Sequence, residues 1–137
     1  MNIIKQNELI YAAHYPLKTL DLEKENHTEW FGDPTESLQG SRMFYNKKTF
    51  RNHIHKLNPR HINFSQESFI IVRGKIGVDV WDETKIPLGT LIATDGDIIF
   101  VWRGYHELKI LEDHTILYEL KAGKYTSVEA DKQFYGE

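Results

Sequence analysis

Histidines and a glutamate near the middle of the chain are the residues best suited to chemistry. His53, His55 and His61 fall within nine residues, and Glu67 opens the apolar run that follows. Residues 50–55 are predicted to form a strand, whose alternate side chains point the same way. His53 and His55 would then lie about 7 Å apart on one face, where both imidazoles could reach one ion. Imidazole binds zinc, iron, copper, nickel and manganese alike, so the metal is not specified.

Two later side chains could complete such a site. Glu67 begins a predicted strand at 67–73 and could bring a carboxylate from a neighbouring strand. His106 lies in a predicted strand at 105–111, with the same parity as Leu108 and Ile110, which predicts that it points inward. Taken alone, each residue is more often a surface, core or rim side chain than a metal ligand. The alternative to a metal site is an exposed edge strand that carries two surface histidines.

The elements that must position these residues are predicted to be β-strands. Short stretches alternate with period two between turn residues, and no long helical pattern separates them. About eight or nine strands favour an all-β barrel or jelly roll, which hides its edges. Besides a candidate edge strand at 9–15, the predicted strands are 41–46, 50–55, 67–73, 76–81, 88–93, 98–102, 105–111 and 115–120.

Composition limits the function classes. A chain of 137 residues suits one domain, and its lack of cysteine excludes disulfides, thiolate ligands and a cysteine nucleophile. The net charge of -3 and the scattered basic residues argue against a nucleic-acid partner. No apolar run reaches the roughly 20 residues that span a bilayer, and no signal-peptide pattern opens the chain. We therefore expect a cytoplasmic protein without a membrane partner.

Taken together, these motifs resemble the cupin superfamily over residues 45–120. Its first motif is written G-x5-H-x-H-x(3–4)-E-x6-G, and here the H-x-H pair is present and Glu67 is followed by six residues and Gly74. Its second motif is G-x5-P-x-G-x2-H-x3-N, which Gly96 to His106 follow in outline. The chain departs from the pattern in five ways: the first glycine of the first motif is absent, eleven residues separate His55 from Glu67, Trp102 replaces the proline, His106 comes one residue early, and Ile110 stands where the asparagine is expected.

The resemblance implies a single-domain double-stranded β-helix, the cupin or jelly-roll barrel. Residues 1–40 would hold an N-terminal strand and loops, 41–120 the barrel core and 121–137 a C-terminal tail. The implied metal ligands are His53, His55, Glu67 and His106, around a divalent iron, manganese, zinc or nickel ion. Cupins often form homodimers through N-terminal segments, which suggests such a role for residues 1–15. The chain also looks like small cupins that are associated with bacterial surface-polysaccharide and sugar biosynthesis.

The expected function is a metal-dependent isomerase or epimerase acting on a small polar substrate such as a sugar or sugar nucleotide. Glu67 and His106 would be its catalytic residues. Arg60 and Arg73 could bind an anionic group of the substrate, and Gln66 could add a hydrogen bond. Three alternatives remain open: an iron-dependent dioxygenase, a non-catalytic cupin that binds a sugar or an anion, and a metal-free acid–base enzyme that uses His53 or His55.

Overall fold

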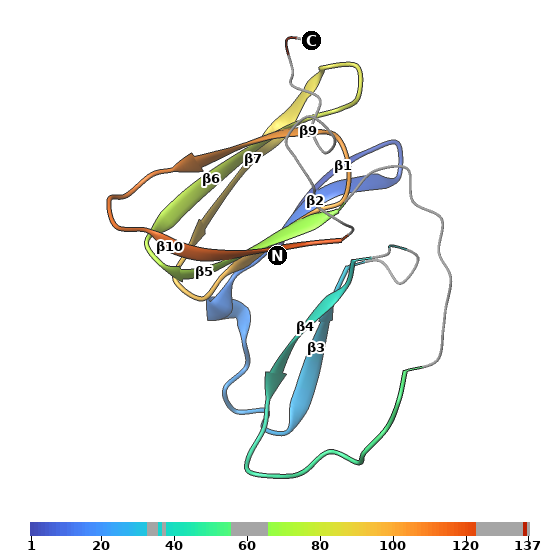
Figure 1. Ribbon diagram of the computed structural model, residues 1–137, viewed down its shortest axis with the longest axis vertical. Coiled ribbons are helices and arrows are strands. Elements are labelled where there is room, and N and C mark those ends of the chain that lie inside the picture. The colour runs from blue at the N-terminus through green and yellow to red at the C-terminus, as the bar shows by residue number, and fades with distance from the viewer. Residues whose placement is uncertain (33–35, 37, 56–65, 123–135, 137) are drawn as a thin grey trace.

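A computed structural model describes residues 1–32, 36, 38–55, 66–122 and 136 (Figure 1). Within them the chain forms ten strands and one short 3-10 helix, η1 (Leu17–Thr19), and every strand pair is antiparallel. The strands are β1 (Asn2–Gln6), β2 (Leu9–Tyr15), β3 (His27–Phe31), β4 (Gly40–Phe44), β5 (Glu67–Arg73), β6 (Lys75–Trp81), β7 (Pro87–Thr94), β8 (Ile98–Val101), β9 (Tyr105–Ile110) and β10 (Ile116–Lys121). No helix in the described residues is long and apolar enough to cross a membrane.

Two sheets enclose the main core. One has five strands in the order β1-β2-β8-β5-β10, and the other has three in the order β7-β6-β9. Alternate residues of the strands turn inward, so Phe69 and Ile71 of β5 meet Val78 and Val80 of β6 in one cluster of buried side chains. Figure 1 shows β5 and β10 below β6 and β7 in the view. The all-β prediction is confirmed, and closure into a double-stranded β-helix stays a prediction.

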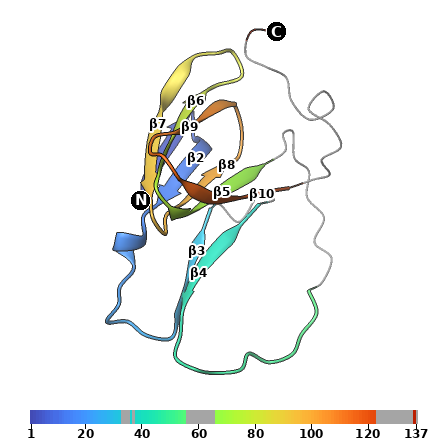
Figure 2. The ribbon, with the colours of Figure 1, turned by 60° about the vertical axis from the view of Figure 1, so that its left-hand side comes forward.

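The hairpin of β3 and β4 forms a separate sheet that extends away from the other two (Figure 2). Its inner end packs on the outer face of the five-stranded sheet, where Phe31 stacks on Tyr15 with ring centroids 4.2 Å apart. Phe100 and Trp102 complete this second cluster. The backbone of β4 can approach Phe100 closely at Gly40 because glycine has no side chain. A Cβ there would lie 2.6 Å from Cζ of Phe100. In the middle of β4, Arg42 also donates hydrogen bonds to the carbonyl oxygens of Tyr15 and Pro16 at 2.9 and 3.2 Å.

The predicted strands from residue 67 onward are confirmed within two residues at each end, but two earlier expectations are wrong. Residues 50–55 form no strand, since Ile54 is 90% exposed and the segment finds no sheet to pair with. Residues 9–15 are not an edge strand, because β2 pairs with β1 on one side and β8 on the other. Residues 1–15 thus complete a sheet, which removes the reason for assigning them to a dimer contact.

Candidate functional site

A contact between Glu67 and His106 joins the two sheets. Glu67 opens β5 with the same parity as the buried Phe69, so its side chain turns toward the interior. His106 of β9 pairs with the buried Val80 of β6 and faces the same side. The imidazole Nε2 meets Oε1 of Glu67 directly. Because a carboxylate carries only acceptors, Nε2 must carry the hydrogen of this bond.

The contact lies at a rim rather than deep in the core. The Glu67 side chain is 9% exposed and that of His106 is 31% exposed. β9 is an edge strand of its sheet, and Leu108 and Ile110, predicted to be core residues, are 37% and 54% exposed there. A small molecule could therefore reach His106 from solvent while Glu67 stays largely shielded.

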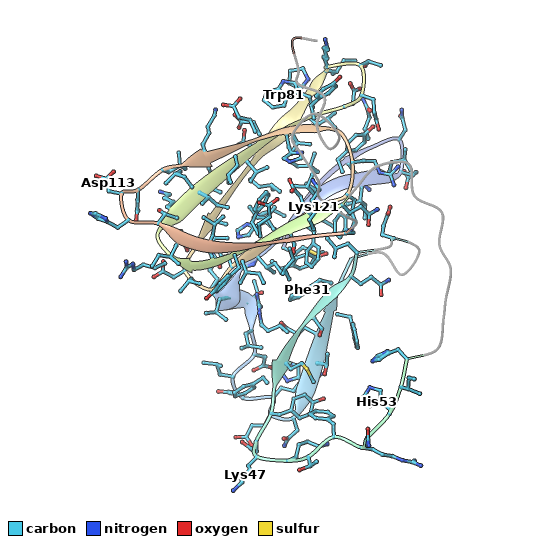
Figure 3. The ribbon with its side chains drawn as sticks, viewed as in Figure 1. Phe31, Lys47, His53, Trp81, Asp113 and Lys121 are labelled. Atoms are coloured by element: carbon cyan, nitrogen blue, oxygen red, sulfur yellow. The ribbon has the colours of Figure 1, made fainter. Side chains whose placement is uncertain are left out.

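Two residues of β10 also lie beside this pair, and neither was predicted from the sequence. Lys121 is directly opposite Glu67, and Glu119 is opposite Phe69, so both share the inward face of Glu67. The Glu119 carboxyl hydrogen-bonds that of Glu67. Figure 3 labels Lys121 at the end of β10. Charges that alternate with apolar residues near a strand end look like an ordinary solvent face, which is why the spacing did not reveal them.

The neighbours of Glu67 fix its charge. Burial by itself raises the pKa of this carboxyl, but the hydrogen bonds with His106 and Glu119 and the charges of His106 and Lys121 outweigh burial and lower the pKa from 4.5 to about 2. Glu67 is therefore ionised throughout the neutral range. In that state it can accept a proton or bind a cation, and it cannot act as a resting acid.

His53 and His55 lie outside this cluster. They belong to an irregular, exposed segment after β4, and Figure 3 shows His53 beyond the sheets and well away from Lys121. The two rings nevertheless face each other, with their Nε2 atoms 3.2 Å apart, and Nδ1 of His53 is 2.8 Å from the Arg51 carbonyl oxygen. The structure thus forms two pairs from the four candidate ligands. In the part of the chain that it describes, no three His, Cys, Asp or Glu side chains are grouped to hold a metal.

No family model, curated protein or solved structure matches the chain. Its function therefore has to be inferred from the side chains themselves.

The residues predicted to bind substrate occupy other places. Both polar atoms of the Gln66 side chain bond to the chain, since Oε1 accepts from the Leu38 amide at 2.7 Å and Nε2 donates to Glu36 at 2.7 Å. Arg73 is exposed at the far end of β5, about 20 Å along the strand from Glu67. Arg60 lies outside the described residues. Gln66 thus holds the segment before β4 against β5.

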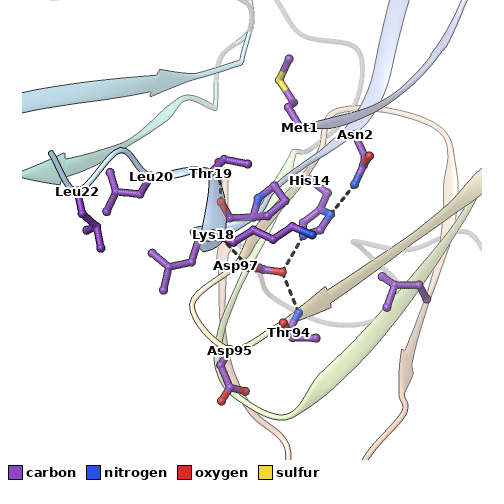
Figure 4. A pocket seen from close by; sticks show the side chains of 13 residues that line it. Met1, Asn2, His14, Lys18, Thr19, Leu20, Leu22, Thr94, Asp95 and Asp97 are labelled. Atoms are coloured by element: carbon purple, nitrogen blue, oxygen red, sulfur yellow. Dashed lines mark hydrogen bonds and ion pairs between the residues drawn. The ribbon is translucent and has the colours of Figure 1, made fainter. Parts of the chain in front are cut away.

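A cavity of about 780 Å³ lies away from these residues, between the start of β1, η1 and the turn before β8. Figure 4 shows the ring of His14 between Asn2 and Asp97 at its floor. Nε2 of His14 is 2.8 Å from Asp97, which also accepts the backbone amides of Leu17 and Thr94. Burial raises the pKa of Asp97, but these hydrogen bonds outweigh it and lower the pKa. His14 therefore belongs to a structural network of hydrogen bonds with Asn2 and Asp97.

Proposed function

We propose that the chain is an acid–base enzyme of the isomerase or epimerase type, acting on a small polar substrate such as a sugar or sugar nucleotide, on the double-stranded β-helix of cupins. The observation that supports this most is the contact of an ionised, shielded Glu67 with a solvent-accessible His106. Pairs of titratable groups whose surroundings separate their roles are typical of proton-transfer sites.

The contact also suggests how substrate binding would activate the base. A carboxyl with a pKa of about 2 is a weak base while His106 donates to it. A substrate carbonyl that takes over the His106 hydrogen bond would remove the donor that lowers the pKa of Glu67 most. Glu67 would then take a proton from the carbon beside the carbonyl, while His106 holds the developing charge on oxygen.

A metal-dependent form of the same enzyme is the second candidate, and the spacing of His53 and His55 favours it. Two nitrogens bound to a tetrahedral ion at 2.0–2.1 Å lie about 3.3 Å apart. The observed 3.2 Å between the Nε2 atoms fits two positions around one ion. When bound, iron, manganese, zinc or nickel would polarise a substrate oxygen.

One experiment tests the proposal and separates its two forms. The protein, purified without chelator or histidine tag, is incubated in D2O with a panel of neutral sugars and nucleotide sugars, and deuterium uptake is followed by mass spectrometry. We expect uptake in at least one sugar, lowered at least about 100-fold in Glu67→Gln. Glu112→Gln is the matched control, because Glu112 is exposed in the turn between β9 and β10.

The outcomes are distinct. If the wild-type protein labels no sugar in the panel, the isomerase proposal is wrong. Uptake that survives treatment with EDTA supports the metal-free form. Loss of uptake with EDTA and with His53→Ala, together with near-stoichiometric metal by elemental mass spectrometry, supports the metal-dependent form.

A further inference from the structure

The cavity beside η1 is held open by one buried carboxylate. Asp97 accepts hydrogen bonds from three elements of the fold. The donors are the His14 ring of β2, the Leu17 amide of η1 and the Thr94 amide of β7, at 2.8, 2.8 and 2.9 Å. Gly96 lets η1 approach this turn, because a Cβ there would lie 2.5 Å from Cδ2 of Leu17. Since breaking these buried bonds is costly, the walls of the cavity are fixed in the free protein.

Apolar side chains form a large part of these walls. Leu17, Leu22 and Ile92 line the cavity, yet they are 44%, 68% and 44% exposed. A single exposed leucine is ordinary on a protein surface, but three such side chains around one cavity make it an apolar site. The volume of about 780 Å³ is within the range of small-molecule sites, which are mostly apolar with a few polar groups. A ligand with an apolar group would shield these side chains from water.

One cation that lines the cavity has no ion-pair partner among the described residues. This cation is the Lys18 ammonium, and Figure 4 shows its side chain in front of the His14 ring. The two carboxylates at the cavity are engaged elsewhere. Asp97 holds its three donors, and Asp95, which points away in Figure 4, accepts the Gly74 amide at 2.7 Å. The charge that remains available to a ligand is therefore positive, which favours an anion.

We propose that this cavity binds a small organic carboxylate that carries an apolar group. The Lys18 ammonium pairs with the carboxylate, and the apolar group contacts Leu17, Leu22 and Ile92. A single ammonium balances one negative charge, which favours a carboxylate over a phosphate monoester with its charge near −2. The inference is independent of the proposed acid–base function, because the cavity is lined by neither Glu67 nor His106.

Octanoate tests this proposal directly. The 15N-labelled protein is titrated at pH 7 with octanoate, octylammonium and 1-octanol, which share one chain length and differ in charge, and amide shifts are followed by NMR. We expect saturable shifts at Leu17 and Thr94, with an affinity for octanoate at least about 5-fold above that for the other two probes. Absence of saturable shifts at these amides up to about 10 mM octanoate would overturn the proposal. Binding of octylammonium at least as tight as that of octanoate would overturn the assignment to a carboxylate.

Two variants test the two halves of the site. Lys18→Gln should weaken octanoate binding at least about 5-fold and leave 1-octanol unchanged, whereas Ile92→Ser should weaken both. Lys24→Gln and Ile86→Ser are the matched controls, because both residues are exposed and neither lines the cavity.

All four substituted side chains are exposed, so the variants should keep the wild-type circular dichroism spectrum. Equal octanoate affinities of Lys18→Gln and Lys24→Gln would overturn the pairing with Lys18. Equal affinities of Ile92→Ser and Ile86→Ser would overturn the apolar part of the site.

Discussion

At the residue scale, the chemistry of Glu67 depends on which groups surround a single buried carboxyl. Desolvation opposes its charge, and three neighbours from β9 and β10 restore it. A carboxyl kept ionised by such contacts stabilises the folded state above its unfolded pKa and loses that contribution as it is protonated. Its effect on stability should therefore depend on pH in a defined window.

We predict that the free energy of unfolding depends less on pH below pH 4.5 in Glu67→Gln than in the wild type. The folded pKa of about 2 lies below the ordinary 4.5, so the carboxylate stabilises the wild type fully above pH 4.5 and progressively less as the pH falls toward 2. The neutral amide cannot titrate. Urea unfolding at pH 7, 4.5 and 2.5 measures this, and the wild type should lose more stability than the variant between the last two. Parallel losses would contradict the assigned pKa.

Gly104, two residues before His106, provides a second prediction. Its φ is +86°, and a Cβ there would meet the Trp81 carbonyl oxygen and Cδ1 of Tyr11. Gly104→Ala should lower the free energy of unfolding by about 1–2 kcal/mol from the left-handed backbone alone, with the contacts adding to this. Gly136→Ala is the control, because nothing lies within 4 Å of its Cβ position. Equal chemical-denaturation midpoints for the two variants would contradict the geometry.

At the scale of elements, β2 links the two hydrophobic clusters. Its Tyr11 and Ala12 belong to the main core between the sheets, whereas Ala13 packs in the second cluster beneath the β3–β4 hairpin. β2 also pairs with β8 through antiparallel backbone hydrogen bonds. The hairpin is less firmly held, because it pairs with neither large sheet in the described residues. In the described residues it is positioned by the aromatic contacts of Phe31 and by the hydrogen bonds of Arg42 to Tyr15 and Pro16.

Removal of residues 1–13 should therefore unfold the protein instead of producing a folded monomer. The deletion takes β1 and most of β2 from the five-stranded sheet and exposes the ladder groups of β8. Circular dichroism and light scattering should show loss of the cooperative transition or aggregation. Ile3→Ser is the control, since Ile3 is 43% exposed on β1 and should leave the fold intact. A folded, monomeric deletion variant would restore residues 1–13 as a dimerisation segment. The homodimer itself stays a prediction.

At the scale of the whole molecule, the chemistry-bearing residues fall into two separate regions. One is the rim between the sheets with Glu67 and His106, and the other is the exposed segment with His53 and His55. The cavity above His14 is a third location that touches neither. The proposed acid–base function and the proposed metal binding should therefore be separable by mutation.

We predict that the double variant His53→Ala, His55→Ala loses binding of zinc or nickel but keeps the fold and the titration of Glu67. Both histidines are exposed, so the free energy of unfolding should change by no more than about 0.5 kcal/mol. In the wild type, metal affinity should fall below about pH 6, because imidazole binds metal only when neutral. Calorimetry and NMR measure the two effects. A changed Glu67 titration would show that the pairs are coupled.

The sequence alone determined the strands from residue 67 onward, because the alternation of 67–73 and 76–81 is a local property that the pleat imposes on any half-buried strand. It also predicted that His106 turns inward, but the parity with Leu108 and Ile110 behind that prediction was misleading, because both of these residues are exposed on β9. It did not show that residues 50–55 lack a partner strand, since the same alternation occurs in a segment with no sheet beside it. Only the tertiary structure showed that Glu119 and Lys121 lie beside Glu67. The register of β5 against β10 is set by packing between residues some fifty positions apart, and the local sequence of either strand does not specify it.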